Sequence, residues 1–212
     1  MKTVQIGIKL DGNGVEIGAG ADLWGCNNTY QALPSTIQPH SWFQIHREED
    51  LYKETAEHRE WLREEHPFPV YMSKRFDEYP SSVPMPYEEL YKLWAFETPA
   101  SFASSFSWMV ALAMHLNYER IFCSGVEFYT PREAWLEAPN FMAWLGIAAG
   151  RGIKVTGSTR LFEPYLYGVE ERRAPTWVPA DVAQDLMLDQ TFEGRQLRSD
   201  WSRRKREWLG MT

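Results

Sequence analysis

One stretch, Ser101–Tyr129, constrains the fold more than any other part of this 212-residue chain. It begins with small hydroxyl residues and continues as a strongly apolar segment of helical length. It then turns at Asn117–Tyr118 and enters a short apolar run, Arg120–Cys123, typical of a buried strand. A helix that leads into such a strand, followed by a polar loop, is half of a parallel α/β unit.

The rest of the chain continues this alternation. Strand patterns occur at residues 3–10, 22–27, 41–46, 67–72 and 153–155, and helical patterns occur at residues 48–66, 87–94 and 132–145. We therefore predict an α/β fold with a Rossmann-like, largely parallel sheet flanked by helices, an N-terminal strand or hairpin and a C-terminal helical appendage. We place the nucleotide-binding domain at residues 1–178 and the helical extension at residues 179–212.

A glycine motif follows the first predicted strand. Asp11-Gly12-Asn13-Gly14 lies between alternating apolar residues, which favours a β-hairpin. The same residues are also compatible with a glycine-rich loop near a nucleotide, through Asn13 and Gly14.

Composition limits the location and the partners. A net charge of −7 argues against nucleic-acid binding by the whole domain. The two cysteines, Cys26 and Cys123, lie in apolar runs typical of reduced core residues, so we expect a cytoplasmic protein. No secretory signal and no apolar run of membrane-spanning length is apparent, so we expect no membrane partner.

The C-terminal extension is basic in its last third and carries Trp201 and Trp208, seven residues apart. We expect these tryptophans to share one face of a helix that docks on the domain or on a second copy of the chain. Nucleic acid is a possible partner only through this basic segment.

Polar residues stand where predicted strands end and where the apolar helix begins. Asn27 and Asn28 follow one strand, His46 ends another, and Ser124 and Gly125 follow a third. Ser104 and Ser105 begin the apolar helix, either as caps or as ligand contacts. In open α/β sheets, strand ends and helix N-termini meet at the ligand-binding edge. No metal-ligand spacing and no Walker loop occurs, which favours metal-free chemistry.

Two blocks of the chain, DLWGCNNTY (Asp22–Tyr30) and SSFSWMVALAMHLNYERIFCSGVEFY (Ser104–Tyr129), resemble the bacterial sialyltransferases of glycosyltransferase family 42. They also resemble related Rossmann-like proteins, including pterin pyrophosphokinase-like domains and similar phage proteins. The resemblance implies that Asn27, Ser104 and Ser105 contact a donor nucleotide. It also implies that Glu127 and Tyr129 act at the phosphate or the acceptor.

The chain departs from the family pattern at three places. Asn13 and Gly14 are the nearest match to the family's Gly-x-Gly-Pro-Ser loop, and Trp135 stands where a phosphate-binding tyrosine is expected. No histidine follows His115, although the family keeps its general base in that region. We expect His46 to serve instead, because His115 falls within the apolar helix, where burying a charged imidazole is costly.

These features predict a metal-independent glycosyltransferase that uses a nucleotide-sugar donor and no cofactor, with an open acceptor. One alternative is a nucleotide-binding or sequestering protein without turnover. Another is a pyrophosphokinase-like transferase, which would need ATP and Mg²⁺ held by carboxylates such as Glu127.

Overall fold

The computed structural model describes residues 1–11, 14–51, 53–94, 102–128 and 133–157. The chain divides into two compact units. The first contains Met1–Val126 and Leu136–Thr159, and Glu127–Trp135 belongs to the second. The predicted boundary at residue 178 and the predicted C-terminal helix lie outside the described residues.

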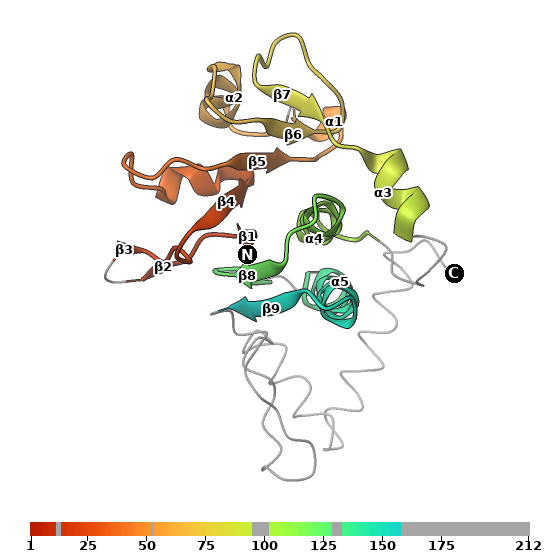
Figure 1. Cartoon of the computed structure of the whole chain (residues 1–212). Coiled ribbons are helices and arrows are strands. Elements are labelled where there is room, and N and C mark those ends of the chain that lie inside the picture. The colour runs from red at the N-terminus through yellow and green to blue at the C-terminus, as the bar shows by residue number, and fades with distance from the viewer. Residues whose placement is uncertain (12–13, 52, 95–101, 129–132, 158–212) are drawn as a thin grey trace, which may run out of the picture. The chain divides into compact units, whose positions relative to one another are not determined.

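Seven strands form the sheet of the first unit, in the order β7-β6-β5-β4-β1-β8-β9, and every neighbouring pair is parallel (Figure 1). Their bounds are β1 Thr3–Ile6, β4 Ala21–Cys26, β5 Ser41–Gln44, β6 Val70–Met72, β7 Ser82–Pro84, β8 Arg120–Cys123 and β9 Lys154–Gly157. The predicted α/β fold with a Rossmann-like sheet is confirmed. The predicted hairpin is present as well, since β2 (Leu10–Asp11) pairs antiparallel with β3 (Gly14–Val15).

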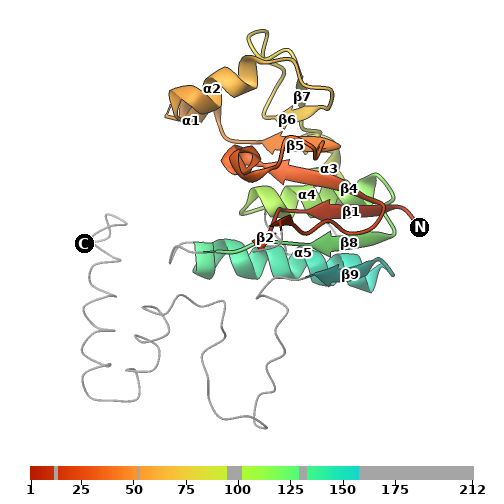
Figure 2. The ribbon, with the colours of Figure 1, turned by 90° about the vertical axis from the view of Figure 1, so that its left-hand side faces the viewer.

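Helices of the first unit flank the sheet, and one further helical turn begins in the second unit. They are η1 Asn27–Ala32, α1 Glu48–Leu51, α2 Ala56–Arg63, α3 Tyr87–Trp94, α4 Ser105–His115, the π-helical turn η2 Glu133–Glu137 and α5 Ala138–Gly150. Figure 2 shows α4 and α5 lying along β1, β8 and β9. Among the helices of the described part of the chain, none has the length and apolar character needed to cross a membrane.

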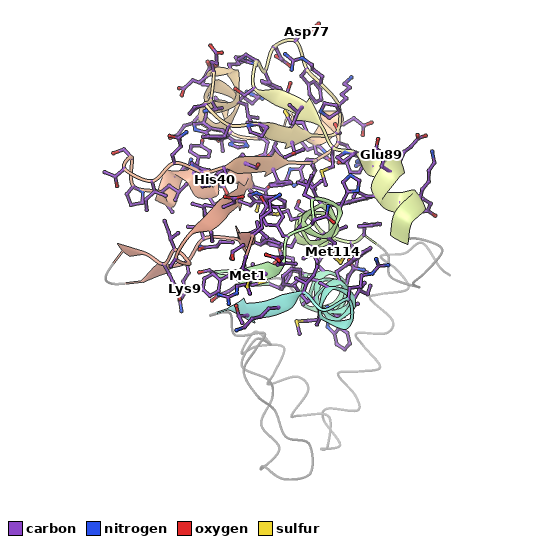
Figure 3. All side chains as sticks on the ribbon, in the orientation of Figure 1. Met1, Lys9, His40, Asp77, Glu89 and Met114 are labelled. Atoms are coloured by element: carbon purple, nitrogen blue, oxygen red, sulfur yellow. The ribbon has the colours of Figure 1, made fainter. Side chains whose placement is uncertain are left out.

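Successive side chains of β4, β5 and β6 point to opposite faces of the sheet and form an apolar layer on each face (Figure 3). On one face, Trp42 packs with Leu51 of α1 and Leu62 of α2. On the other face, the ring of Trp24 lies 5.1 Å from that of Phe43. Gly25 makes room for the first layer, because a Cβ there would lie 2.2 Å from the Trp42 ring.

Several elements differ from the sequence-based prediction, and three of these differences have a clear local cause. The predicted helix over residues 48–66 is two helices, because the Thr55 hydroxyl accepts a hydrogen bond from the His58 backbone N–H and starts α2 anew. The first strand ends at Ile6, because Gly7 takes a φ of 84°. β7 was missed, since a three-residue strand ending in Pro84 resembles a turn, and proline is tolerated because β7 is at the sheet edge.

The loop after β8 has a glycine whose replacement tests this architecture. Gly125 has a φ of 64°, and a Cβ there would lie 2.1 Å from the Ile8 carbonyl oxygen. Gly152 has a φ of 84° but no atom within 4 Å of its would-be Cβ. Each Gly→Ala change should cost about 1–2 kcal/mol for the left-handed backbone. Gly125→Ala should cost clearly more, because the Ile8 backbone must also move.

Urea unfolding of the two variants measures this difference. Equal losses in the free energy of unfolding would show that the contact between Gly125 and Ile8 is not tight in solution.

Candidate functional site

The carboxyl edge of the sheet is the candidate site. The chain builds β4, β5, β6 and β7 on one side of β1 and then returns to place β8 on the other side. Ligands of open α/β sheets bind outside the carboxyl ends of the strands near such a reversal. α4 also begins at this edge. It runs back to the turn at Glu119, whose backbone N–H donates to the Lys2 carbonyl at the amino end of the sheet.

At the reversal itself, the loops that follow β1 and β8 touch. A Cβ on Gly7 would lie 2.4 Å from the Ser124 carbonyl oxygen, and a Cβ on Gly125 would lie 2.1 Å from the Ile8 carbonyl oxygen. Ser124 is fully buried, and its hydroxyl donates to a Glu16 carboxylate oxygen at 3.2 Å. The predicted site residues Ser124 and Gly125 thus form a close backbone junction between two loops.

The side chain of Gln5, in β1, binds the backbone of the segment that connects β1 to β4. This buried side chain accepts a hydrogen bond from the Gly18 backbone N–H at 2.7 Å and donates to the Glu16 carbonyl at 2.8 Å. Gly14, also a predicted site residue, lies within this connection as part of β3. Asn13 lies outside the described residues.

Next to this junction, Asn27 and Asn28 follow β4 in the first turn of η1. Asn27 has a φ of 51°, a left-handed conformation that asparagine tolerates better than most residues. Its carbonyl accepts a hydrogen bond from the Trp42 indole N–H at 2.9 Å. The Asn27 side-chain oxygen is buried and has no hydrogen-bond partner among the described residues, while Asn28 is exposed.

At the start of α4, the two predicted serines differ. Ser104 is buried and is the N-cap, since its hydroxyl accepts a hydrogen bond from the Ser107 backbone N–H. The Ser107 hydroxyl donates to the Asn140 side-chain oxygen at 2.5 Å, which ties this end of α4 to α5. Ser105 is half-buried in the first turn. Of the two roles considered for these serines, helix cap or ligand contact, Ser104 has the role of a helix cap.

His46 lies two residues beyond the end of β5, and a carboxylate accompanies it. The His46 Nδ1 atom is 3.1 Å from a Glu54 carboxylate oxygen. The His46 side chain is 38% exposed and that of Glu54 is 25% exposed, so the pair lies at the surface of the edge. A carboxylate at Nδ1 favours a proton on that nitrogen and leaves Nε2 as the acceptor.

Glu54 is the residue that the sequence analysis missed. Asp50 lies closer to His46 in the sequence, but it accepts hydrogen bonds from Lys53 and Arg47, which lower its pKa. Glu54 occupies the break between α1 and α2, just before the Thr55 cap. A Ser/Thr cap signal within the acidic segment was the available clue.

Three predicted residues fall outside the described part of the first unit. Glu127 and Trp135 belong to the second unit, and the Trp135 side chain is exposed. Tyr129 lies outside the described residues. His115 is the last residue of α4 and is half-buried, so it lies at the helix end, contrary to the expectation of an interior position.

A second histidine–carboxylate pair lies at the opposite, amino edge of the sheet. His40, labelled in Figure 3, precedes β5, and its Nε2 atom lies 3.3 Å from an Asp22 oxygen. Its Nδ1 atom accepts a hydrogen bond from the Leu23 backbone N–H at 3.0 Å, and the Tyr118 hydroxyl donates to Asp22 at 2.6 Å. His40 is therefore a natural control for His46.

The fold and the edge define an α/β protein with a histidine–carboxylate pair among the carboxyl ends of parallel strands. Within the part of the chain that the structure describes, no group of three or more His, Cys, Asp or Glu side chains is arranged to hold a metal ion. Comparison of the chain with protein-family models, curated proteins and solved structures found no match.

Buried His58, on α2, makes the stability depend on pH. Burial lowers the pKa of His58 below its ordinary value of 6.5, an effect that the Glu54 carboxylate opposes and His46 reinforces. The unfolded chain therefore binds a proton that the folded protein does not. The contribution of His58 is complete above about pH 6.5 and is lost as the pH falls through the folded-state pKa.

Urea unfolding above and below that pH, with His58→Gln as the comparison, measures this contribution. The unmodified protein should lose more free energy of unfolding on acidification than the variant does. Equal losses in both proteins would contradict a buried, neutral His58.

Proposed function

We propose that this protein is a metal-independent glycosyltransferase that takes its glycosyl group from a nucleotide sugar. The His46–Glu54 pair is the observation that carries the proposal, because it presents a proton acceptor at the edge where such sheets bind nucleotides. Asn27 and Asn28 follow the adjacent strand, β4, at the same edge.

In the proposed reaction, a hydroxyl oxygen of the acceptor attacks the anomeric carbon of the donor sugar. The bond from that carbon to the phosphate oxygen breaks, and the nucleotide leaves with the electron pair. His46 Nε2 takes the hydroxyl proton, and the Glu54 carboxylate stabilises the resulting imidazolium. Atoms and charge balance without a metal or a redox cofactor.

The donor would be held by neutral hydrogen-bonding groups. The Asn27 side chain is half-buried in the first turn of η1, and its amide group can form hydrogen bonds to a base. Ser105 lies at the N-terminus of α4, where the helix dipole favours a phosphate. Following the family resemblance, Glu127, Tyr129 and Trp135 remain proposed contacts to the phosphate or the acceptor.

One observation favours a second candidate, a protein that binds a nucleotide without turnover. The junction of Gly7 and Ile8 with Ser124 and Gly125 occupies the reversal point, and Ser124 is committed to Glu16. Such a protein would retain the contacts at Asn27 and the α4 N-terminus but would not use His46 for proton transfer.

A thermal-shift panel of nucleotides and nucleotide sugars, followed by a transfer assay with any stabilising donor, separates these functions. A specific ligand raises the melting temperature by mass action. We expect His46→Ala to lower turnover by about 10²–10⁴-fold, the usual contribution of a proton-transfer group, with the donor Kd changed by less than about tenfold.

His40→Ala is the matched control and should leave turnover unchanged. Full activity of His46→Ala would remove His46 from the mechanism. Stabilisation by a donor without turnover would establish the binding protein instead, and a panel without any stabilising ligand would refute both functions.

A further inference from the structure

A continuous line of hydrogen bonds runs from the interior to His46. The His58 Nε2 atom lies 3.1 Å from the Gln44 side-chain oxygen. The Gln44 amide nitrogen lies 3.3 Å from a Glu54 oxygen and 3.0 Å from His46 Nδ1. That same Glu54 oxygen is 3.1 Å from His46 Nδ1. His58 and Gln44 are buried, whereas Glu54 and His46 reach the surface.

The proton positions in this line follow from counting donors and acceptors. Ionised Glu54 only accepts, so the Gln44 NH₂ group faces it and the Gln44 oxygen faces His58. His58 must then donate from Nε2, which leaves its Nδ1 without a proton. That Nδ1 atom is buried and has no partner among the described residues, so its lone pair is an unsatisfied acceptor rather than an unsatisfied donor.

The negative charge of Glu54 decides the tautomer of His46. If Nδ1 carried no proton, it would accept a hydrogen bond from Gln44 at 3.0 Å, but its lone pair would also face the ionised Glu54 oxygen at 3.1 Å, which is repulsive. A proton on Nδ1 turns that contact into a hydrogen bond, and Gln44 then donates to Glu54 alone. In this arrangement His58 donates to Gln44, and both Gln44 and His46 donate to the same Glu54 oxygen. The 3.0 Å approach of the Gln44 nitrogen to His46 Nδ1 is then a contact between two donors that share one acceptor.

We propose that His58 and Gln44 are positioning residues that orient Glu54 and thereby fix His46 as the Nδ1–H tautomer, with Nε2 free to take a proton. The role in catalysis rests on the proposed function, but the tautomer itself is a property of the ligand-free protein. Gln44 is the directional element, because its amide has a donor end and an acceptor end that cannot be exchanged without breaking two contacts.

The surroundings of His58 keep its imidazole neutral and fixed in position. The imidazole is 1% exposed and stacks on the Tyr30 ring, with centroids 5.5 Å apart and planes inclined by 15°. A charged imidazole is costly there, so His58 stays a neutral single donor. Tyr30 also stacks on Trp61 at 4.1 Å, which fixes the ring that supports His58.

Imidazole ¹⁵N–¹H correlation spectra of the labelled full chain test the proposal without substrate. In mildly alkaline buffer, we expect the Nδ1 of His46 to show the shift of a proton-bearing nitrogen and its Nε2 that of a bare one. Gln44→Met should move His46 toward the Nε2–H tautomer, which free histidine prefers. Glu54→Gln, a nearly isosteric change at a partly exposed residue, should do the same even if the Gln44 variant fails to fold.

His40→Gln is the control and should leave the His46 shifts unchanged. A bare Nδ1 on His46 in the unmodified protein would overturn the proposal, as would His46 shifts that do not respond to Glu54→Gln. Because these spectra need no donor, an absence of glycosyl transfer would refute the proposed function and leave the tautomer assignment standing.

Discussion

The parallel pairing of β1 with both β4 and β8 is the constraint on which the rest of the first unit depends. With every strand of this sheet pointing the same way, all loops that leave a strand emerge at one edge. Asn27, His46 and Ser124 come from separate parts of the sequence, and this shared direction alone places them on the same edge. The helix α4 adds its N-terminus there because it must return the chain to the amino end before β8.

Different parts of this edge have different roles: one part is closely packed backbone, and another part presents polar groups. At the reversal between β1 and β8, glycines allow two backbones to meet, and Ser124 is engaged with Glu16. At β4 and β5, polar groups reach the surface: Asn28 is exposed, and His46 is partly exposed. The candidate chemistry therefore lies at the ends of β4 and β5, beside the point of reversal.

Local sequence signals were sufficient for much of the fold. The Arg120–Cys123 strand, the helix over residues 87–94 and the hairpin at Asp11–Gly14 each depend on a short pattern, and each is present. β7 was not predicted, because a strand of three residues is too short to show an alternating apolar pattern. The junction of Gly7 with Ser124 could not be predicted, since it joins residues far apart in the sequence. Glu54 was missed for a similar reason: its partner, His46, reaches it only after the chain turns through α1.

The central claim is that ligands bind at the ends of β4 and β5, and amide chemical-shift mapping tests it most directly. The ¹⁵N-labelled protein is titrated with nucleotides and nucleotide sugars. The account predicts saturable shifts concentrated at Asn27, Asn28, Ser105 and His46. Saturable shifts confined to the amino edge around Asp22 and His40, or no saturable shifts with any of these ligands, would contradict it.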